Sequence, residues 1–174
     1  DILTGSLRCG GCQASYPIER GIPRFVPTGN YATSFGYQWN RFRQEQIDSL
    51  NGTRQSEERL SNETAWESNW WNGKTILDAG CGPGVFTFEI AKRFPKSTVT
   101  GVDIEDSLLA TNTQIAENLH LYNCRFEHID LTGMEESERF DLILSVDNLE
   151  HIEDDDNALR RFYQALTNGG DLIL

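Results

Sequence analysis

The sequence lacks any apolar run near the roughly 20 residues that a helix needs to cross a bilayer, and it has few basic residues. Its 15 Lys and Arg residues stand against 27 Asp and Glu residues, which gives the 174-residue chain a formal net charge of −12. A protein that binds a nucleic-acid backbone needs a basic excess to neutralise the phosphates. We therefore expect no membrane span, and nucleic acid is disfavoured as a partner.

Cysteine is also scarce. Of the four cysteines only Cys9 and Cys12 are close in the chain, and no apolar leader precedes them to indicate secretion. We therefore expect a cytoplasmic protein, in which a C-x-x-C pair indicates metal or redox chemistry more readily than a disulfide. Tetrahedral zinc takes four ligands and no second C-x-x-C follows, so this pair is a half-site. Cys81 and Cys124 are interpreted as small buried residues.

Composition divides the chain into three segments. Residues 1–30 are punctuated by Cys, Gly and Pro, residues 31–73 are rich in aromatic and polar residues, and residues 74–174 alternate between apolar runs and helical periodicity. The chain begins with Asp1 instead of Met and ends inside an apolar run. We therefore expect it to be a fragment that is cut at both ends.

The third segment alternates between strand-like and helix-like patterns, as α/β domains do. Five short apolar runs rich in β-branched residues predict strands, and three patterns with helical spacing lie between them. This alternation predicts right-handed βαβ units and a doubly wound, mostly parallel sheet with helices on both faces. Pro95 and the pair Gly169–Gly170 are expected to stop helices. The predicted strands are 75–79, 97–103, 124–129, 140–146 and 171–174, and the predicted helices cover 86–94, 108–119 and 159–166.

A glycine-rich loop follows the first predicted strand. Gly80, Gly82 and Gly84 allow tight turns and let a ligand approach the backbone closely. The dinucleotide pattern G-x-G-x-x-G would need a glycine where Val85 stands, so the loop does not predict a pyrophosphate cradle or a nicotinamide-dependent reductase. The P-loop pattern fails as well, because no Gly-Lys-Ser/Thr follows.

Acidic residues follow the next two predicted strands. Asp103 ends the second strand 19 positions after Gly84, where nucleotide-binding sheets use a carboxylate to accept hydrogen bonds from ribose hydroxyls. Asp130 and Leu131 follow the third strand and are placed to bracket an adenine. The order and spacing of these features favour a ligand that contains a nucleoside.

The same motifs, in this order, resemble the motif set of class I S-adenosylmethionine (AdoMet)-dependent methyltransferases over residues 74–174. The runs that carry the resemblance are ILDAGCGPGVFT, VDI, FDLILSVDNLEHI and ALTNGGDLIL. The resemblance implies a Rossmann-like fold whose seven-stranded sheet is truncated here after the fifth strand. It also implies that the glycine loop faces the methionine portion of AdoMet and that the two following acids serve the ribose and the adenine. The implied cofactor-binding residues are Asp78, Gly80, Cys81, Gly82, Gly84, Asp103, Ile104, Asp130 and Leu131.

The loop after the fourth predicted strand brings together two carboxylates and an imidazole, Asp147, Glu150 and His151. His151 suits a general base, because imidazole can remove a proton near neutral pH. Alternatively, the three side chains ligate a divalent ion that lowers the pKa of an acceptor hydroxyl. The loop resembles that of ubiquinone-biosynthesis O-methyltransferases, which implies Mg²⁺, although Asp147 replaces a Glu of that family. In a third interpretation, Glu150 and His151 cap the helix that follows through the acidic run 153–156.

Two further resemblances concern the first two segments. Residues 7–26 resemble the second half of a bacterial zinc-ribbon module, which implies that Cys9 and Cys12 are half of a structural zinc site; otherwise they are two unpaired thiols. The aromatic stretch that follows has apolar residues at helical spacing, which is typical of packing. Related methyltransferases carry a similar Ser-Phe-Gly-x-Gln-Trp segment as a helical lid over the cofactor. The implied lid residues are Tyr31, Phe35 and Trp39.

Taken together, these features predict an AdoMet-dependent methyltransferase that acts on a small molecule, with oxygen favoured over nitrogen or carbon as the acceptor atom. Two alternatives stay open. One is a methyltransferase directed at tRNA or protein, which the negative charge disfavours, and the other is an AdoMet-binding partner protein without catalysis. An inert binder has no need of Asp147, Glu150 and His151 together, so this loop separates an enzyme from a binder.

Overall fold

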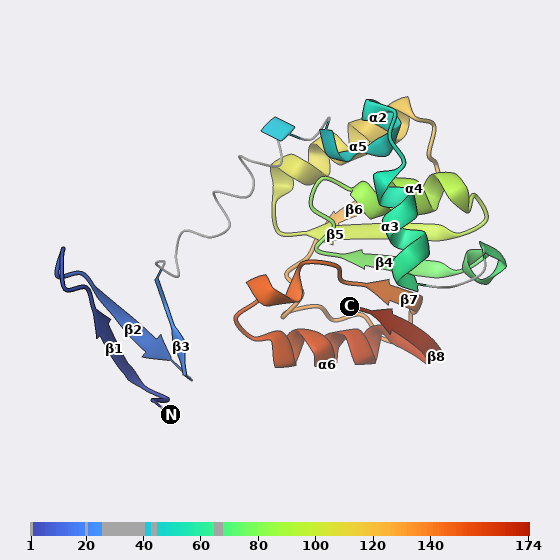
Figure 1. The fold of residues 1–174 in the computed structure, drawn as a ribbon. Helices are drawn as coiled ribbons and strands as arrows, with labels where there is room; N and C mark the ends of the chain where they lie inside the picture. The colour runs from blue at the N-terminus through green and yellow to red at the C-terminus, as the bar shows by residue number, and fades with distance from the viewer. Residues whose placement is uncertain (1, 20, 26–40, 43–44, 65–67) are drawn as a thin grey trace. The chain divides into compact units, whose positions relative to one another are not determined.

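The computed structural model describes all residues except 1, 20, 26–40, 43–44 and 65–67 (Figure 1). The chain forms two compact units, Asp1–Phe35 and Gly36–Leu174. Each unit has its own β-sheet. Among the described residues, no helix combines the length and the apolar character needed to span a bilayer.

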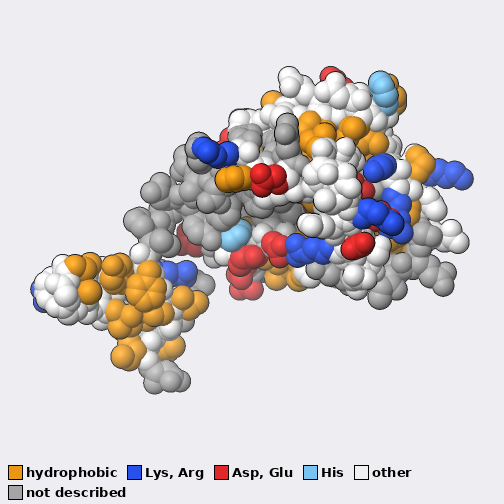
Figure 2. Space-filling view, turned by 45° about the horizontal axis from the view of Figure 1, so that its top comes forward, with side chains coloured by type: hydrophobic (Ala, Val, Ile, Leu, Met, Phe, Trp, Pro, Cys, Tyr) orange, Lys and Arg blue, Asp and Glu red, His pale blue; other side chains and the backbone are white. Residues whose placement is uncertain are grey.

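The first unit is a three-stranded antiparallel sheet. Strands β1 (Gly5–Arg8), β2 (Ser15–Glu19) and β3 (Ile22–Pro23) are hydrogen-bonded in that order. Of its described residues only Ile18 is buried, and hydrophobic side chains cover much of its surface in Figure 2. A core this small supplies little stability, and units of this size commonly depend on a metal or a disulfide. The most exposed hydrophobic side chains are Ile2, Leu3, Leu7, Ile22 and Phe25.

The second unit is built on a five-stranded parallel sheet with the order β6-β5-β4-β7-β8. Strands β4, β5 and β6 follow one another in chain order on one side, whereas β7 returns to pair with the other side of β4. This reversal makes the carboxyl ends of β4 and β7 the topological switch point, where open α/β sheets bind ligands. The strands are β4 (Thr75–Ala79), β5 (Thr98–Asp103), β6 (Cys124–His128), β7 (Phe140–Leu144) and β8 (Leu166–Ile173).

Helices cover both faces of this sheet (Figure 1), with α4 and α5 on one face and α6 on the other. Ile76 packs in the cluster that contains α4, whereas the next residue, Leu77, packs with α6, because successive strand side chains point to opposite faces. The helices are α2 (Asp48–Asn51), α3 (Gln55–Thr64), α4 (Val85–Arg93), α5 (Asp106–Asn118) and α6 (Asp155–Ala165), with short 3-10 turns η1 (Ser68–Trp71) and η2 (Leu149–His151).

Part of the aromatic segment packs onto the sheet unit. Trp71 of η1 is buried with Phe94, just after α4, and their rings stack with centroids 5.5 Å apart. The buried carboxylate of Asp48 accepts hydrogen bonds from the backbone nitrogens of Ser56 and Glu57, at 2.9 and 3.1 Å. These bonds satisfy free amides in the first turn of α3. They tie α3 to α2, while Leu60 of α3 packs in the buried cluster that contains Ile90 of α4. The placement of α3 on α4 bears on the site because α3 carries Arg59.

The predicted five-stranded parallel sheet is confirmed, and its strands and helices lie within a few residues of the predicted ranges. The last strand differs most, since it begins at Leu166 and not at Asp171. Leu166 pairs with Phe140, and the register then shifts so that Leu142 pairs with Asp171. Gly169, which has a φ of 79°, therefore lies at an irregularity inside β8. Contrary to the sequence prediction, it does not end the preceding helix. Helix α6 has already ended at Ala165.

Candidate functional site

The glycine loop lies between the end of β4 and the start of α4, at the switch point of the sheet. The backbone nitrogens of Gly80 and Cys81 both donate to the carbonyl oxygen of Val102 at 2.9 Å, which ties the loop to β5. Gly82 has a φ of 49°, in the left-handed region, and no heavy atom lies within 4 Å of the position that a Cβ would take there. The loop thus leaves open space in front of Gly82.

Asp103 and Asn112 hold the Gly82 peptide from two sides. The Gly82 nitrogen donates to Oδ2 of Asp103 at 2.9 Å, while the Nδ2 amide of Asn112 donates to the Gly82 carbonyl at 2.9 Å. The other oxygen of Asp103 accepts from the Glu105 nitrogen at 3.1 Å. The structure thus brings Asp103 and the glycine loop together, as the sequence predicts. Asn112 is fully buried in α5 and was missed as a site residue, although a polar residue in an apolar helical pattern is a detectable signal.

Asp78 supports the loop from inside the protein. Its side chain is buried, and its carboxylate accepts a hydrogen bond from the Thr87 hydroxyl at 2.5 Å. Burial raises the pKa of Asp78 to about 6, and the negative charge of Asp103 adds to this rise, while hydrogen bonds from Thr87 oppose it. Asp78 therefore joins the end of β4 to α4 below the glycines.

The predicted adenine side of the site lies after β5 and β6. Ile104 is 54% exposed and follows directly after Asp103, whereas Leu131 is buried in the core beside Val102. Asp130 is exposed, and its carboxylate accepts from the Thr132 nitrogen at 2.9 Å and from the Thr132 hydroxyl at 2.7 Å. These hydrogen bonds, the one from the hydroxyl first, lower the pKa of Asp130. A charged carboxylate thus stands at the carboxyl end of β6.

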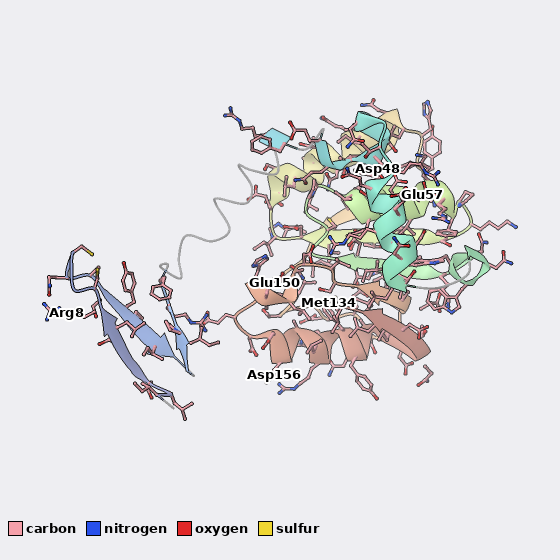
Figure 3. All side chains as sticks on the ribbon, in the orientation of Figure 1. Arg8, Asp48, Glu57, Met134, Glu150 and Asp156 are labelled. Atoms are coloured by element: carbon pink, nitrogen blue, oxygen red, sulfur yellow. The ribbon has the colours of Figure 1, made fainter. Side chains whose placement is uncertain are left out.

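The loop after β7 contains a residue with a left-handed backbone. Asp147 has a φ of 51°, and its two carboxylate oxygens accept hydrogen bonds from the Nη1 and Nη2 atoms of Arg59 at 2.7 and 3.1 Å. The hydrogen bond from Arg59 is the main cause that lowers the pKa of Asp147, and the nearby His151 adds to it. Glu150, labelled in Figure 3, and His151 are both exposed on η2, at the edge toward which the strands point.

Two of the three interpretations of this loop lose support. The structure shows that Asp154 is the N-cap of α6, because its carboxylate accepts from the Asn157 nitrogen at 3.3 Å. The interpretation of Glu150 and His151 as caps of that helix is therefore wrong, since they form the separate turn η2. Nowhere in the described part of the chain do three His, Cys, Asp or Glu side chains converge as metal ligands. Asp147, Glu150 and His151 are thus not gathered as a magnesium site.

The predicted half-site lies in the turn between β1 and β2. The Cys9 nitrogen donates to the Ala14 carbonyl at 2.8 Å, and the Gln13 nitrogen donates to the Cys9 carbonyl at 3.0 Å, which closes the turn. The backbone N–H groups of Cys12 and then Gly11 hydrogen-bond to the Cys9 sulfur and lower the pKa of its thiol. Both thiols are free, Cys81 is buried and Cys124 is half-buried. The predicted lid residues Tyr31, Phe35 and Trp39 lie outside the described residues.

A family model described as "Methyltransferase domain" matches residues 72–174, which contain the glycine loop, Asp103, Asp130 and the loop after β7. The chain belongs to this methyltransferase family. The match confirms the family that the ordered motifs predicted. Arg59 and helix α3 lie ahead of the matched range.

Relatives of this methyltransferase chain include two groups of named enzymes. Phosphoethanolamine N-methyltransferase 3 of Arabidopsis thaliana is 29% identical over 157 residues, which cover 90% of this chain and 31% of the relative. A ubiquinone biosynthesis O-methyltransferase of Pseudomonas fluorescens is 30% identical over 103 residues, which cover 58% of this chain and 43% of the relative. The chain therefore spans less than half the length of these relatives.

Solved structures share the fold of the sheet unit. The crystal structure of coclaurine N-methyltransferase bound to N-methylheliamine and SAH matches with a TM-score of 0.59 and 24% identity. The match covers 66% of this chain and 32% of the other. At this identity the likeness concerns the fold alone, which is the Rossmann-like methyltransferase fold.

Proposed function

We propose that this chain carries the AdoMet-binding part of an enzyme that methylates a small molecule. The observation that supports this most strongly is the hydrogen bond from the Gly82 nitrogen to Asp103, because it joins the glycine loop to the acid of the next strand. A small-molecule acceptor is supported by the names of the two relatives, which refer to phosphoethanolamine and to ubiquinone biosynthesis.

The residues at the switch point fit AdoMet. The open space in front of Gly82 admits a ligand against the backbone, and Asp103 has carboxylate oxygens that can turn from backbone amides to ribose hydroxyls. Exposed Ile104 offers an apolar surface to an adenine ring, and Asp130 offers an acceptor to its amino group. The remaining predicted residues would then support the pocket from the protein side: Asp78, Gly80, Cys81, Gly84 and Leu131.

The chemistry requires little from the protein beyond orientation and proton removal. AdoMet, when bound, supplies a methyl group that is already a strong electrophile. A hydroxyl acceptor must lose its proton as it reacts, whereas a neutral amine needs no base to attack. We assign this base to His151, since the Asp147 carboxylate is engaged by Arg59 and no ligand set for Mg²⁺ is gathered among the described residues. Oxygen is therefore the acceptor atom we propose.

A transfer assay on the full-length protein tests this proposal. AdoMet with a labelled methyl group is incubated with phenols, carboxylic acids, small amines, tRNA and protein, and the label is followed in each fraction. The proposal expects label in a small hydroxyl compound, whereas label in carboxylic acids, which are already ionised and need no base, overturns the role of His151. Label in amines overturns the choice of oxygen, and label only in tRNA or protein overturns the small-molecule acceptor. AdoMet binding without transfer to any class supports the binder instead.

We also propose that Cys9 and Cys12 are two of four zinc ligands in the full-length protein. Two neighbouring amides already hydrogen-bond the Cys9 sulfur and favour its thiolate, which is the form that binds zinc. The small sheet has only one buried described residue, so it would gain from a metal. Metal analysis should find one zinc per chain, which is lost in Cys9→Ser; zinc retained in Cys9→Ser, or none in the parent protein, contradicts the assignment.

A further inference from the structure

Arg59 joins two segments that flank the glycine loop. Its guanidinium forms the bidentate pair with Asp147, just after β7, and lies 5.7 Å from the ring centroid of Phe86, in the first turn of α4. A bidentate Arg–carboxylate pair fixes geometry more closely than a single-contact ion pair does. Figure 1 shows α3, which carries Arg59, running across α4 toward β7.

Asp147 in turn determines where the next residue lies. Aspartate adopts a left-handed backbone more readily than most residues, but still at some cost, so contacts with the surroundings help to hold this turn. The side chain of Asn148 lies directly on Gly80: a Cβ at Gly80 would stand 2.2 Å from Cγ and Oδ1 of Asn148. The Nδ2 atom of Asn148 also donates to the Ser145 hydroxyl at 3.0 Å. A shift of the Asp147 turn would therefore move Asn148 against the glycine loop.

We propose that Arg59 is a positioning residue for the cofactor: by holding Asp147 it keeps Asn148 on Gly80, and so sets the affinity of the glycine loop for AdoMet. This inference rests on the proposed function, because it takes AdoMet as the ligand of the loop. Losing Arg59 lets the loop populate other conformations, and the apparent affinity falls with the fraction of molecules that remain competent to bind. The pair itself is well exposed, with 41% of the Arg59 side chain and 66% of the Asp147 side chain accessible, so its loss should hardly change global stability.

The dissociation constant of AdoMet and the melting temperature are measured for the full-length protein and five variants. Arg59→Gln and Asp147→Asn disrupt the pair from either side, and asparagine tolerates the left-handed turn much as aspartate does. Each is expected to weaken AdoMet binding about 3–10-fold, and the double variant to weaken it no more than the stronger single variant, because both act through one contact. Arg59→Lys should recover part of the loss.

Arg54→Gln is the matched control. Arg54 lies just ahead of α3 and forms an exposed bidentate pair with Glu57 that does not touch the loop after β7. It should bind AdoMet like the parent. Equal affinity of Arg59→Gln and the parent, additive losses in the double variant, or an equal loss in Arg54→Gln overturns the inference. If Arg59→Gln fails to fold, Asp147→Asn and Arg59→Lys are each compared with the parent, and unchanged AdoMet affinity in both overturns the inference. If the parent protein binds no AdoMet, the proposed function itself is refuted. If the parent binds AdoMet and Arg59→Gln binds it equally well, only the role of Arg59 is refuted.

Discussion

The Oδ2 atom of Asp103 lies 2.9 Å from the backbone nitrogen of Gly82, so one hydrogen bond joins the carboxyl end of β5 to the glycine loop after β4. The same carboxylate also accepts from the Glu105 nitrogen at 3.1 Å. Asp103 therefore accepts hydrogen bonds from two backbone amides. We expect the hydroxyls of a bound ribose to donate hydrogen bonds to these carboxylate oxygens.

Replacing Asp103 tests this role. Asp103→Ala removes a charge-assisted hydrogen-bond acceptor, which is worth about 1.5–3 kcal/mol, so the dissociation constant of AdoMet should rise about 10- to 150-fold. Calorimetric titration measures the change. Asp106→Ala, on the exposed first turn of α5, serves as the control and should bind nearly as the parent does. Equal affinity in Asp103→Ala would remove this residue from the cofactor site.

Asp78 should make stability fall as pH rises. Burial raises its pKa from an ordinary 3.8 to about 6, so the folded protein holds the proton more tightly than the unfolded chain does. The stabilisation is complete below about pH 4 and is lost as pH rises through about 6, on the order of 3 kcal/mol in total.

Asp78→Asn keeps an oxygen for the Thr87 hydroxyl but cannot ionise. Its free energy of unfolding, followed by urea denaturation at several pH values, should exceed that of the parent at pH 8 and should lose the slope between pH 4 and 6. Asp130→Asn is the control. The pKa of Asp130 is lowered and not raised, so the effect of this substitution on the pH dependence of the free energy of unfolding should have the opposite sign. Parallel pH profiles for the parent and Asp78→Asn would refute this account of Asp78.

Gly80 is restricted by its backbone and by its neighbour. Its φ is 75°, and an added Cβ would collide with the Asn148 amide. Gly52, the C-cap of α2, has a similar φ of 74° but open space at the Cβ position. Gly52→Ala should therefore cost only the backbone penalty, about 1–2 kcal/mol, whereas Gly80→Ala should cost more.

The double variant Gly80→Ala/Asn148→Ala separates the two contributions to the cost at Gly80. It removes the collision but keeps the backbone strain, so it should recover part of the stability that Gly80→Ala loses. Chemical denaturation of the four proteins supplies the comparison. If Gly80→Ala costs no more than Gly52→Ala, Asn148 does not lie on the loop as described.

His151 should control the rate but not the binding of AdoMet. As a general base it contributes about 10²–10⁴-fold to turnover, so His151→Gln should lower kcat by that factor and leave the affinity for AdoMet unchanged. A chelator should have no effect on the rate of the parent, because the base needs no metal. His120→Gln alters another exposed histidine, which lies between α5 and β6, and should behave as the parent. Full activity in His151→Gln would exclude the base, and inhibition by chelator would favour a metal.

Much of the fold could be predicted because buried parallel strands appear in the sequence as short continuous apolar runs. The start of β8 could not, since Leu166 completes the helical spacing of 159 and 162 and the register shift that follows leaves no apolar pattern. The link between Asp103 and the glycine loop was predictable from their places after adjacent strands. This part of the site therefore follows from the order of motifs.

The rest of the site depends on contacts between distant parts of the chain. Arg59 and Asp147 are 88 positions apart, and nothing near Arg59 distinguishes it from the other basic residues. Asn148 reaches Gly80 only because β7 returns to pair with β4. Such contacts come from sheet order and register, which local patterns of residues do not specify.

Calorimetric titration of the full-length protein with AdoMet, its demethylated product S-adenosylhomocysteine and NAD tests the central claim most directly. The G-x-G-x-G spacing of the loop and the carboxylate of Asp103 predict that AdoMet and S-adenosylhomocysteine bind and that NAD does not. Heat from NAD with none from AdoMet would contradict the account.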